Sequence, residues 1–260
     1  MDLIKNTILI TGGTSGIGYE LASQLLARGN TVIITGRDQA KLNETKKKLP
    51  DVYIFQSDVS DPKAVSALYK KLTVEFPNLN MLINNAGIMR KLNIHDEKID
   101  LEGITQEIEI NLNGPIRMTK QFLPHLKNQK NSAIVNVSSG LAFVPFAISP
   151  VYSATKAAIH SFSQSLRLQL KRTKIQVFEL APPGTETPLF RGKEFNDKDL
   201  NGMKGMDVKA MVQLALKGIE KDQLEIRPGL SNVLKFISRV APNFGVNMLG
   251  KAVDTMLDES

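Results

Sequence analysis

The sequence has no cysteine and no tryptophan among its 260 residues. The lack of cysteine excludes disulfide bonds, zinc–thiolate sites and thiol nucleophiles, and it leaves the redox compartment open. The histidines, His95, His125 and His160, are far apart and have no metal-ligand spacing with carboxylates, so His160 is expected to pack or to face solvent. We therefore expect no metal site.

Long apolar runs are also missing. No segment approaches the ~18 consecutive apolar residues that would cross a bilayer, so no integral membrane segment is expected. The first residues, MDLIKNTILITGG, lack the apolar core and small-residue cleavage site of a signal peptide. Together these absences predict a cytoplasmic protein.

Acidic residues are outnumbered by basic ones, 26 to 33, for a net charge of +7. Such an excess can indicate a nucleic acid, an anionic lipid or a phosphorylated ligand. The densest basic run, Lys46-Lys47-Lys48, has no interleaved aromatic residues for base stacking and fits a solvated helix end. We expect no nucleic-acid partner, while a phosphorylated ligand stays possible.

Apolar, β-branched segments alternate with segments of helical period. The expected strands are residues 7–11, 31–35, 52–57, 80–87, 132–139, 175–182 and, more weakly, 223–228. Buried strands separated by helices indicate a parallel sheet covered on both faces. No repeat, linker or shift in composition marks a second domain. The pattern predicts an α/β fold, a single Rossmann-type domain over residues 1–260 with a doubly wound parallel sheet of about seven strands.

A glycine-rich turn, TGGTSGIG at 11–18, joins the first strand to a helix expected to begin near Tyr19. This context indicates a dinucleotide-binding loop rather than a plain glycine-rich turn. Gly12 would allow the tight turn. Gly16 and Gly18 would let the backbone approach a pyrophosphate at the helix N-terminus.

Tyr152 and Lys156 are four residues apart in a helical stretch, so they share one helix face. The pair is either a cation–π contact or a phenol whose pKa is lowered by the ammonium. With the Thr-Gly-x-x-x-Gly-x-Gly spacing upstream, it resembles the classical branch of the short-chain dehydrogenase/reductase family. The resemblance covers roughly residues 5–190. The motifs that extend it are NNAG at 84–87, Asn111, Ser139 thirteen residues before Tyr152, and PPGTETP at 182–188.

The resemblance implies hydride transfer between a nicotinamide cofactor and a carbonyl or alcohol substrate. It assigns Tyr152 as the general acid or base, with Lys156 lowering the pKa of the phenol and binding the nicotinamide ribose. Ser139 would hold the substrate oxygen, with Ser138 as the competing assignment. Asn111 would distort its helix and hold a water connected to Lys156. The cofactor-binding residues it implies are Gly12, Thr14, Ser15, Gly16, Ile17, Gly18, Arg37, Asp58, Val59, Asn85, Ala86, Gly87, Tyr152, Lys156, Pro183, Gly184, Thr185 and Thr187.

The end of the second strand bears on the choice of cofactor. Gly36 stands at the family's usual acidic position, and Arg37 follows it. The glycine leaves room for a 2′-phosphate and the arginine can bind it, so the pair favours NADP(H). NAD(H) stays possible if Asp38 serves as the acidic residue. Ser15 stands where some NADPH-preferring members carry a basic residue. Asp58, with Val59 beside it, matches the family's adenine-contacting aspartate.

The substrate end is less defined. Residues 188–207 are expected to form a lid over the substrate, or a surface loop. The apolar segment at 223–260 could line a pocket for a hydrophobic substrate, form an interface, or touch a membrane surface through Lys235, Arg239 and Lys251. The sequence as a whole, including EIRPG at 225–229, resembles bacterial DltE-like short-chain oxidoreductases. By the resemblance, helices near 104–127 and 151–171 would build a homodimer or homotetramer.

Other functions fit the sequence less well. An extended-branch epimerase or dehydratase usually has a longer chain and a different glycine spacing. Enoyl reductases of the divergent branch space the tyrosine and lysine more widely. A non-catalytic NAD(P)-binding sensor or scaffold would typically have lost the tyrosine or lysine, and both are present here.

Overall fold

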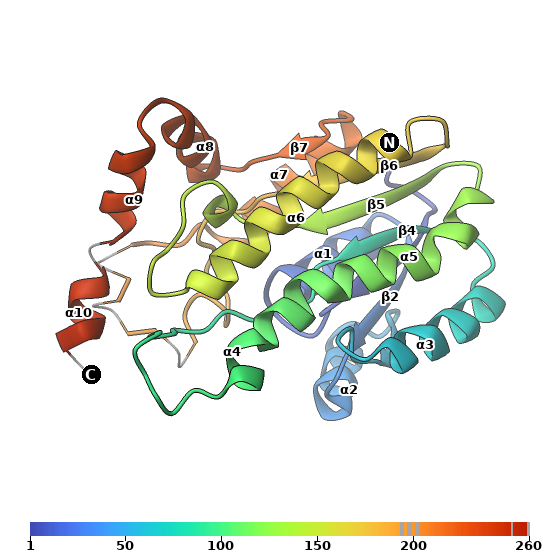
Figure 1. Ribbon diagram of the computed structural model, residues 1–260. Helices are drawn as coiled ribbons and strands as arrows, with labels where there is room; N and C mark the ends of the chain where they lie inside the picture. The colour runs from blue at the N-terminus through green and yellow to red at the C-terminus, as the bar shows by residue number, and fades with distance from the viewer. Residues whose placement is uncertain (193–194, 197–198, 201–202, 251, 259–260) are drawn as a thin grey trace.

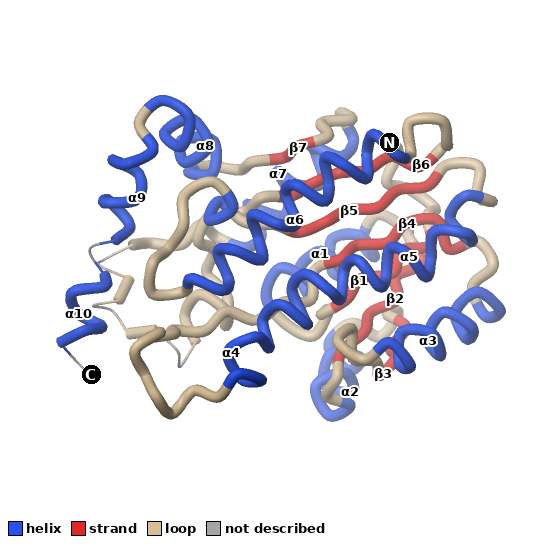
Figure 2. The backbone as a smooth tube through the Cα atoms, in the orientation of Figure 1, coloured by secondary structure: helices blue, strands red, loops and turns tan. Residues whose placement is uncertain are grey.

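The computed structural model describes residues 1–192, 195–196, 199–200, 203–250 and 252–258. Its strands form one parallel sheet in the order β3-β2-β1-β4-β5-β6-β7, between two layers of helices (Figures 1 and 2). The predicted seven-stranded doubly wound sheet is confirmed. Its strands are β1 (Thr7–Thr11), β2 (Thr31–Gly36), β3 (Tyr53–Gln56), β4 (Leu79–Asn84), β5 (Ser132–Val137), β6 (Ile175–Leu180) and β7 (Glu225–Ile226).

The helices follow the strands in the alternating order that the sequence predicts. One of them is a π-helical turn, which continues α4 into α5 without a break. They are α1 (Gly16–Ala27), α2 (Gln39–Lys48), α3 (Pro62–Glu75), α4 (Leu101–Ile108), the π-helix (Glu109–Asn113), α5 (Gly114–Lys127), a 3₁₀ turn (Gly140–Ala142), α6 (Pro150–Gln169), α7 (Val208–Glu220), α8 (Leu230–Val240), α9 (Pro242–Gly250) and α10 (Ala252–Asp258).

The alternation of side chains along each strand divides the core into two layers. In β1, Ile8 and Ile10 pack with apolar residues of α1, α2 and α7, whereas Leu9 packs with α3, α5 and α6 on the opposite face. Side chains that alternate along a strand can be apolar on both sides only where helices cover both faces. The uninterrupted apolar runs of the central strands therefore dictate the three-layer arrangement seen in Figure 1.

Several strands end earlier than predicted. β4 ends at Asn84, β5 at Val137 and β6 at Leu180, so the polar motifs that follow them lie in loops beyond the sheet. Backbone pairing continues only briefly there, with the amide of Ser138 donating to the carbonyl of Leu180 at 2.8 Å. These loops gather at the carboxyl edge of the sheet. From β1 the chain continues outward to β2 and β3, and it then returns to form β4 on the other side of β1. Ligands of doubly wound folds bind at the point where the strand order reverses in this way.

Within the described residues, no helix combines the length and apolar character needed to cross a membrane.

Candidate functional site

The glycine-rich turn after β1 runs directly into α1. Gly12 (φ +68°) and Gly16 (φ +54°) have left-handed backbone angles that favour glycine. A Cβ at Gly12 would also lie 2.8 Å from the Cα of Ala86. Helix α1 begins at Gly16, three residues before the predicted Tyr19. The glycine-rich turn therefore leads directly into the first turn of the helix, whose backbone N–H groups have no partner within the helix.

Gly18 is needed for close packing inside the loop. A Cβ there would lie 2.2 Å from the carbonyl oxygen of Gly12 and 2.4 Å from Nδ2 of Asn85. The Asn85 side-chain amide itself donates to the carbonyls of Thr11 and Gly12, both at 3.0 Å. Gly18 therefore lets the first turn of α1 pack against its own loop, and it does not face the cleft.

A cleft runs along the carboxyl edge of the sheet from this turn to α6. It brings together most of the residues predicted to bind a cofactor. Those lining it are Gly12, Thr14, Ser15, Gly16, Ile17, Arg37, Asp58, Val59, Asn85, Ala86, Gly87, Tyr152, Lys156 and Thr187. Gly18, Pro183, Gly184 and Thr185 do not line it, and Pro182 takes the place expected for Pro183. Thr185 donates from Oγ1 to the carbonyl of Pro183 at 2.8 Å.

The end of the cleft at β2 carries two cations. Arg37 was predicted, but Lys41, one turn into α2, also lines the cleft and was missed. Asp38 is the N-cap of α2, and its Oδ1 accepts from the amides of Ala40 and Lys41 at 2.9 and 3.1 Å. That carboxylate is thus engaged by its own helix. The N-cap pattern Asp-x-x-Lys is the sequence signal that places Lys41 beside Arg37.

Asp58 lines the cleft as predicted, at the end of the loop after β3. Its Oδ1 accepts from the amide and the hydroxyl of Ser60, at 2.8 and 2.6 Å, which fixes the side chain before α3 begins.

Asn111 lies in the π-helical turn, in agreement with the predicted helix distortion. Its Oδ1 accepts from the amide of Ile88 at 2.9 Å, and its Nδ2 donates to the carbonyl of the same residue at 2.8 Å. The Asn111 side chain therefore satisfies both backbone polar groups of Ile88, as a neighbouring strand would, and so holds the loop after β4. The π-turn widens the helix so that a buried asparagine can reach that loop.

Tyr152 and Lys156 line the cleft, and Ser139 lies beside the Tyr152 hydroxyl. Tyr152 and Lys156 are on one face of α6, both buried, with Lys156 Nζ 5.4 Å from the centre of the phenol ring. Nζ donates to the carbonyl of Val137 at 2.9 Å. The Tyr152 hydroxyl is hydrogen-bonded to the side chain of Ser139, whose Oγ accepts from the amide of Leu141. Ser138, the competing serine, lines the cleft and donates from Oγ to Oε1 of Glu179 at 2.6 Å.

Burial is the largest cause of the pKa shifts of Tyr152 and Lys156. Burial raises the pKa of Tyr152 to about 12, opposed by the hydrogen bond with Ser139 and reinforced by the negative charge of Glu107. Burial also lowers the pKa of Lys156 to about 8. The expected lowering of the phenol pKa is thus not a property of the tyrosine–lysine pair by itself. The two side chains are in the geometry of a buried cation–π contact, so the ammonium is over the ring and not directly at the hydroxyl.

An apolar cluster packs around Tyr152. It joins the loop before α6, the segment after β6 and the C-terminal helix, and consists of Met89, Phe146, Ile148, Tyr152, Phe195, Leu200, Ala252 and Met256. Lys91, in the loop after β4, also pairs with the buried Asp199 at 2.7 Å. Of the predicted lid, residues 193–194, 197–198 and 201–202 lie outside the described residues, as do 251 and 259–260 of the predicted C-terminal segment.

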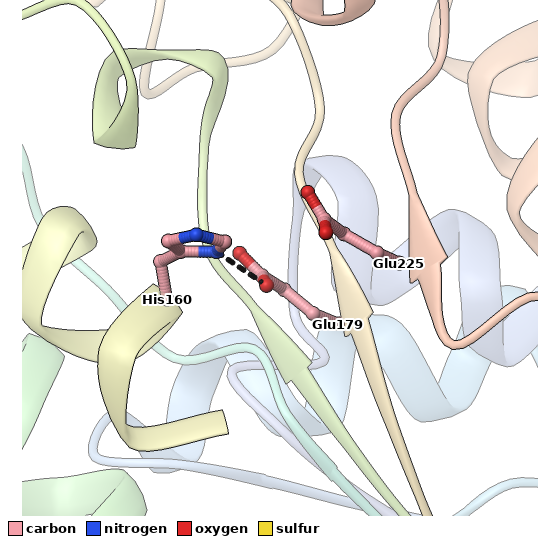
Figure 3. Close-up of side chains that lie close together, drawn as sticks. All are labelled: His160, Glu179 and Glu225. Carbon is pink, nitrogen blue, oxygen red and sulfur yellow. Dashed lines mark hydrogen bonds and ion pairs between the residues drawn. The ribbon is translucent and has the colours of Figure 1, made fainter. Parts of the chain in front are cut away.

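Among the histidines, His95 is exposed and His160 has a partner that sequence reasoning missed. His160 Nδ1 is 2.7 Å from Oε2 of Glu179, a fully buried carboxylate in β6 (Figure 3). The available signal was a glutamate inside an otherwise buried apolar strand, IQVFEL.

Comparison with known proteins agrees with this geometry. The family model described as short chain dehydrogenase matches residues 6–198. The chain is 45% identical over 226 residues to the uncharacterized oxidoreductase DltE of Bacillus subtilis, covering 87% of this chain and 89% of that protein. It is 33% identical over 199 residues to the NADP-dependent 3-hydroxy acid dehydrogenase YdfG of Escherichia coli K12, covering 76% and 78%.

A solved structure shares the fold at 28% identity. It is a short-chain dehydrogenase from Sphingobium yanoikuyae in complex with NADPH, with a TM-score of 0.78 and coverage of 98% of this chain and 96% of that one.

Proposed function

Because this chain belongs to the short-chain dehydrogenase family, an oxidoreductase family, we propose that it transfers hydride between NADP(H) and a carbonyl compound or its alcohol. The observation that carries the proposal is that Tyr152 and Lys156 line a cleft that begins at a glycine-rich helix N-terminus, with the side chain of Ser139 hydrogen-bonded to Tyr152. We also propose cytoplasmic location and assembly as a homo-oligomer.

The cleft fits a dinucleotide. Gly12 and Gly16 leave the approach to the N-terminus of α1 free of side chains, where a pyrophosphate would meet backbone amides. Arg37 and Lys41 would hold the 2′-phosphate, since Asp38 is engaged as a helix cap. Asp58 would contact the adenine, and Tyr152 and Lys156 the nicotinamide ribose. When bound, the nicotinamide supplies or accepts the hydride.

The chain's own residues would manage the proton. During reduction, Tyr152 donates its phenolic proton to the carbonyl oxygen as hydride adds to the carbon, which gives the alcohol. Ser139 donates a hydrogen bond to the same oxygen and stabilises its developing charge. Lys156 would stabilise the phenolate that remains, and the positive charge of an oxidised nicotinamide would add to that stabilisation. These charges counter the burial that raises the pKa of the phenol.

The substrate we propose has an apolar body. Its reacting carbon would have to lie beside Tyr152, and the cluster around that residue is built from methionine, phenylalanine and aliphatic side chains. The similarity to a 3-hydroxy acid dehydrogenase supports a hydroxy or keto acid as the first compounds to test.

The proposal is tested by adding protein to NADPH and NADH in parallel and following the fluorescence of the reduced nicotinamide. The absence of tryptophan leaves this signal free of energy transfer from indole. NADPH consumption is then measured with a panel of aldehydes, ketones and keto acids. Failure to bind either nucleotide would overturn the proposal.

We expect the double variant Arg37→Ala, Lys41→Ala to bind NADPH about 10²–10⁴-fold more weakly while NADH affinity changes less than threefold. Each lost charge-assisted hydrogen bond to a phosphate is worth ~1.5–3 kcal/mol, and ~1.4 kcal/mol is tenfold in affinity. Lys47→Ala, at an exposed position near the far end of the same helix, is the matched control. An equal loss for both nucleotides would mean that the two cations do not select the phosphate.

A further inference from the structure

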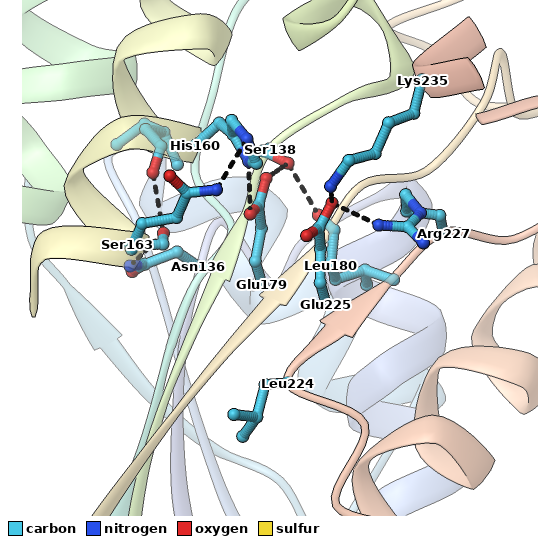
Figure 4. A network of polar contacts seen from close by, with 12 residues as sticks. Asn136, Ser138, His160, Ser163, Glu179, Leu180, Leu224, Glu225, Arg227 and Lys235 are labelled. Atoms are coloured by element: carbon cyan, nitrogen blue, oxygen red, sulfur yellow. Dashed lines mark hydrogen bonds and ion pairs between the residues drawn. The ribbon is translucent and has the colours of Figure 1, made fainter. Parts of the chain in front are cut away.

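Glu179 is a carboxylate with no exposed surface in the middle of the molecule. A buried carboxylate costs several kcal/mol unless charged or polar partners satisfy it. Both of its oxygens have partners, as Figure 4 shows: Ser138 donates from Oγ to Oε1 at 2.6 Å, and His160 Nδ1 is 2.7 Å from Oε2. One side chain of β6 thus holds two neighbouring elements, the end of β5 and helix α6.

These two elements carry the proposed catalytic residues. Ser138 directly precedes Ser139, and its peptide bond with Val137 supplies the carbonyl that receives Lys156 Nζ at 2.9 Å. His160 is one helical turn beyond Lys156 on α6. Glu179 therefore ties the segment bearing Ser139 to the helix bearing Tyr152 and Lys156, directly behind the point where they meet.

A metal ion is the competing explanation, because Glu225 on β7 brings a third possible ligand within 4.8 Å of the other two (Figure 3). However, Glu225 is already paired with Arg227 at 2.5 Å and with Lys235, and these two cations lower the pKa of its carboxyl against the effect of burial. Both oxygens of Glu179 are engaged as well. The carboxylate that would be the third ligand is therefore already neutralised by two cationic side chains.

We propose that Glu179 is a positioning residue for the reaction, which through Ser138 and His160 fixes the Ser139 hydroxyl against the Tyr152 phenol. The proposal rests on the proposed function. Glu179 itself touches neither the cleft nor the phenol. Its effect is on the direction of the Ser139 hydroxyl, so it should alter the chemical step and leave cofactor binding unchanged.

The test is Glu179→Gln, which keeps the shape and removes the charge. We expect kcat for reduction of the best carbonyl substrate to fall at least tenfold, with the Kd for NADPH changed less than twofold. The control is Glu225→Gln, which alters a neighbouring carboxylate that does not contact Ser138, and its kcat should stay within twofold of the parent. A fall in both variants, or in NADPH affinity to the same degree, would indicate a general packing effect and contradict the proposal.

Ser138→Ala provides the second measurement. If Glu179 acts through Ser138, the double variant should lose about as much activity as the more damaging single variant, because the two changes break one connection. Losses that multiply would mean that the two residues act separately.

A parent protein that reduces none of the carbonyl compounds would overturn the proposed function, and the positioning role is then decided by hydrogen exchange. Amides of residues 138–145 should exchange at least tenfold faster in Glu179→Gln and at the parental rate in Glu225→Gln. Unchanged exchange in Glu179→Gln would overturn the positioning role.

Discussion

Replacing Tyr152 by phenylalanine is expected to lower kcat for carbonyl reduction by about 10²–10⁴-fold, the usual contribution of a positioned general acid. The substitution removes only the hydroxyl that is hydrogen-bonded to Ser139. The ring keeps its contacts within the apolar cluster and its position under Lys156, so the fold and NADPH affinity should persist. Steady-state rates and a fluorescence titration on the same preparation measure both.

Tyr69→Phe is the matched control, since Tyr69 packs edge-on against Phe122 and does not line the cleft. It should turn over at the parental rate. Retention of more than a tenth of parental kcat by Tyr152→Phe would mean that another group delivers the proton. The alternative of a non-catalytic nucleotide sensor would then regain support.

Replacing Lys156 by methionine is expected to abolish turnover and also to raise the melting temperature at pH 7. Lys156 is buried, and burial lowers the pKa of its ammonium from 10.5 to about 8. Folding at pH 7 must therefore carry a charge out of water, and methionine removes that cost while filling similar space. Each kcal/mol recovered corresponds to about 2–4 °C for a chain of this size.

The stabilising effect of Lys156→Met should depend on pH. Below pH 8 the lysine is charged in both the folded and unfolded chain, and the stabilising effect of methionine is largest. Between pH 8 and 10.5 the unfolded chain holds more protons than the folded one, so the parent gains stability as pH rises. The difference in melting temperature should shrink across that window. Lys47→Met, at an exposed position, should show no such trend.

A melting temperature of Lys156→Met that falls at pH 7, or a difference that does not vary between pH 8 and 10.5, would contradict this account. It would mean that the bond from Nζ to the Val137 carbonyl outweighs the cost of burying the charge.

The fold, the seven strands and the glycine-rich loop could all be predicted from the amino-acid sequence. These features depend on local chemistry: apolar runs that must be covered on both faces, and glycines at 12 and 16 that adopt left-handed angles. The four-residue interval between Tyr152 and Lys156 likewise fixed their shared face, because helix geometry is the same wherever a helix forms. Asn111 was found through family resemblance, and it lies in a π-helical turn, from which its side chain bonds to the backbone of Ile88.

Other features could not be predicted, because they depend on contacts between residues that are far apart in the sequence. Gly18 is confined by Asn85, 67 positions along the chain. His160 meets Glu179 because α6 packs across β5 and β6. The direction of the Tyr152 and Lys156 pKa shifts also follows from burial, which no four-residue motif contains. A charge pair alone would lower the pKa of the phenol, but the surrounding apolar side chains withdraw both groups from water, and that desolvation is the larger effect.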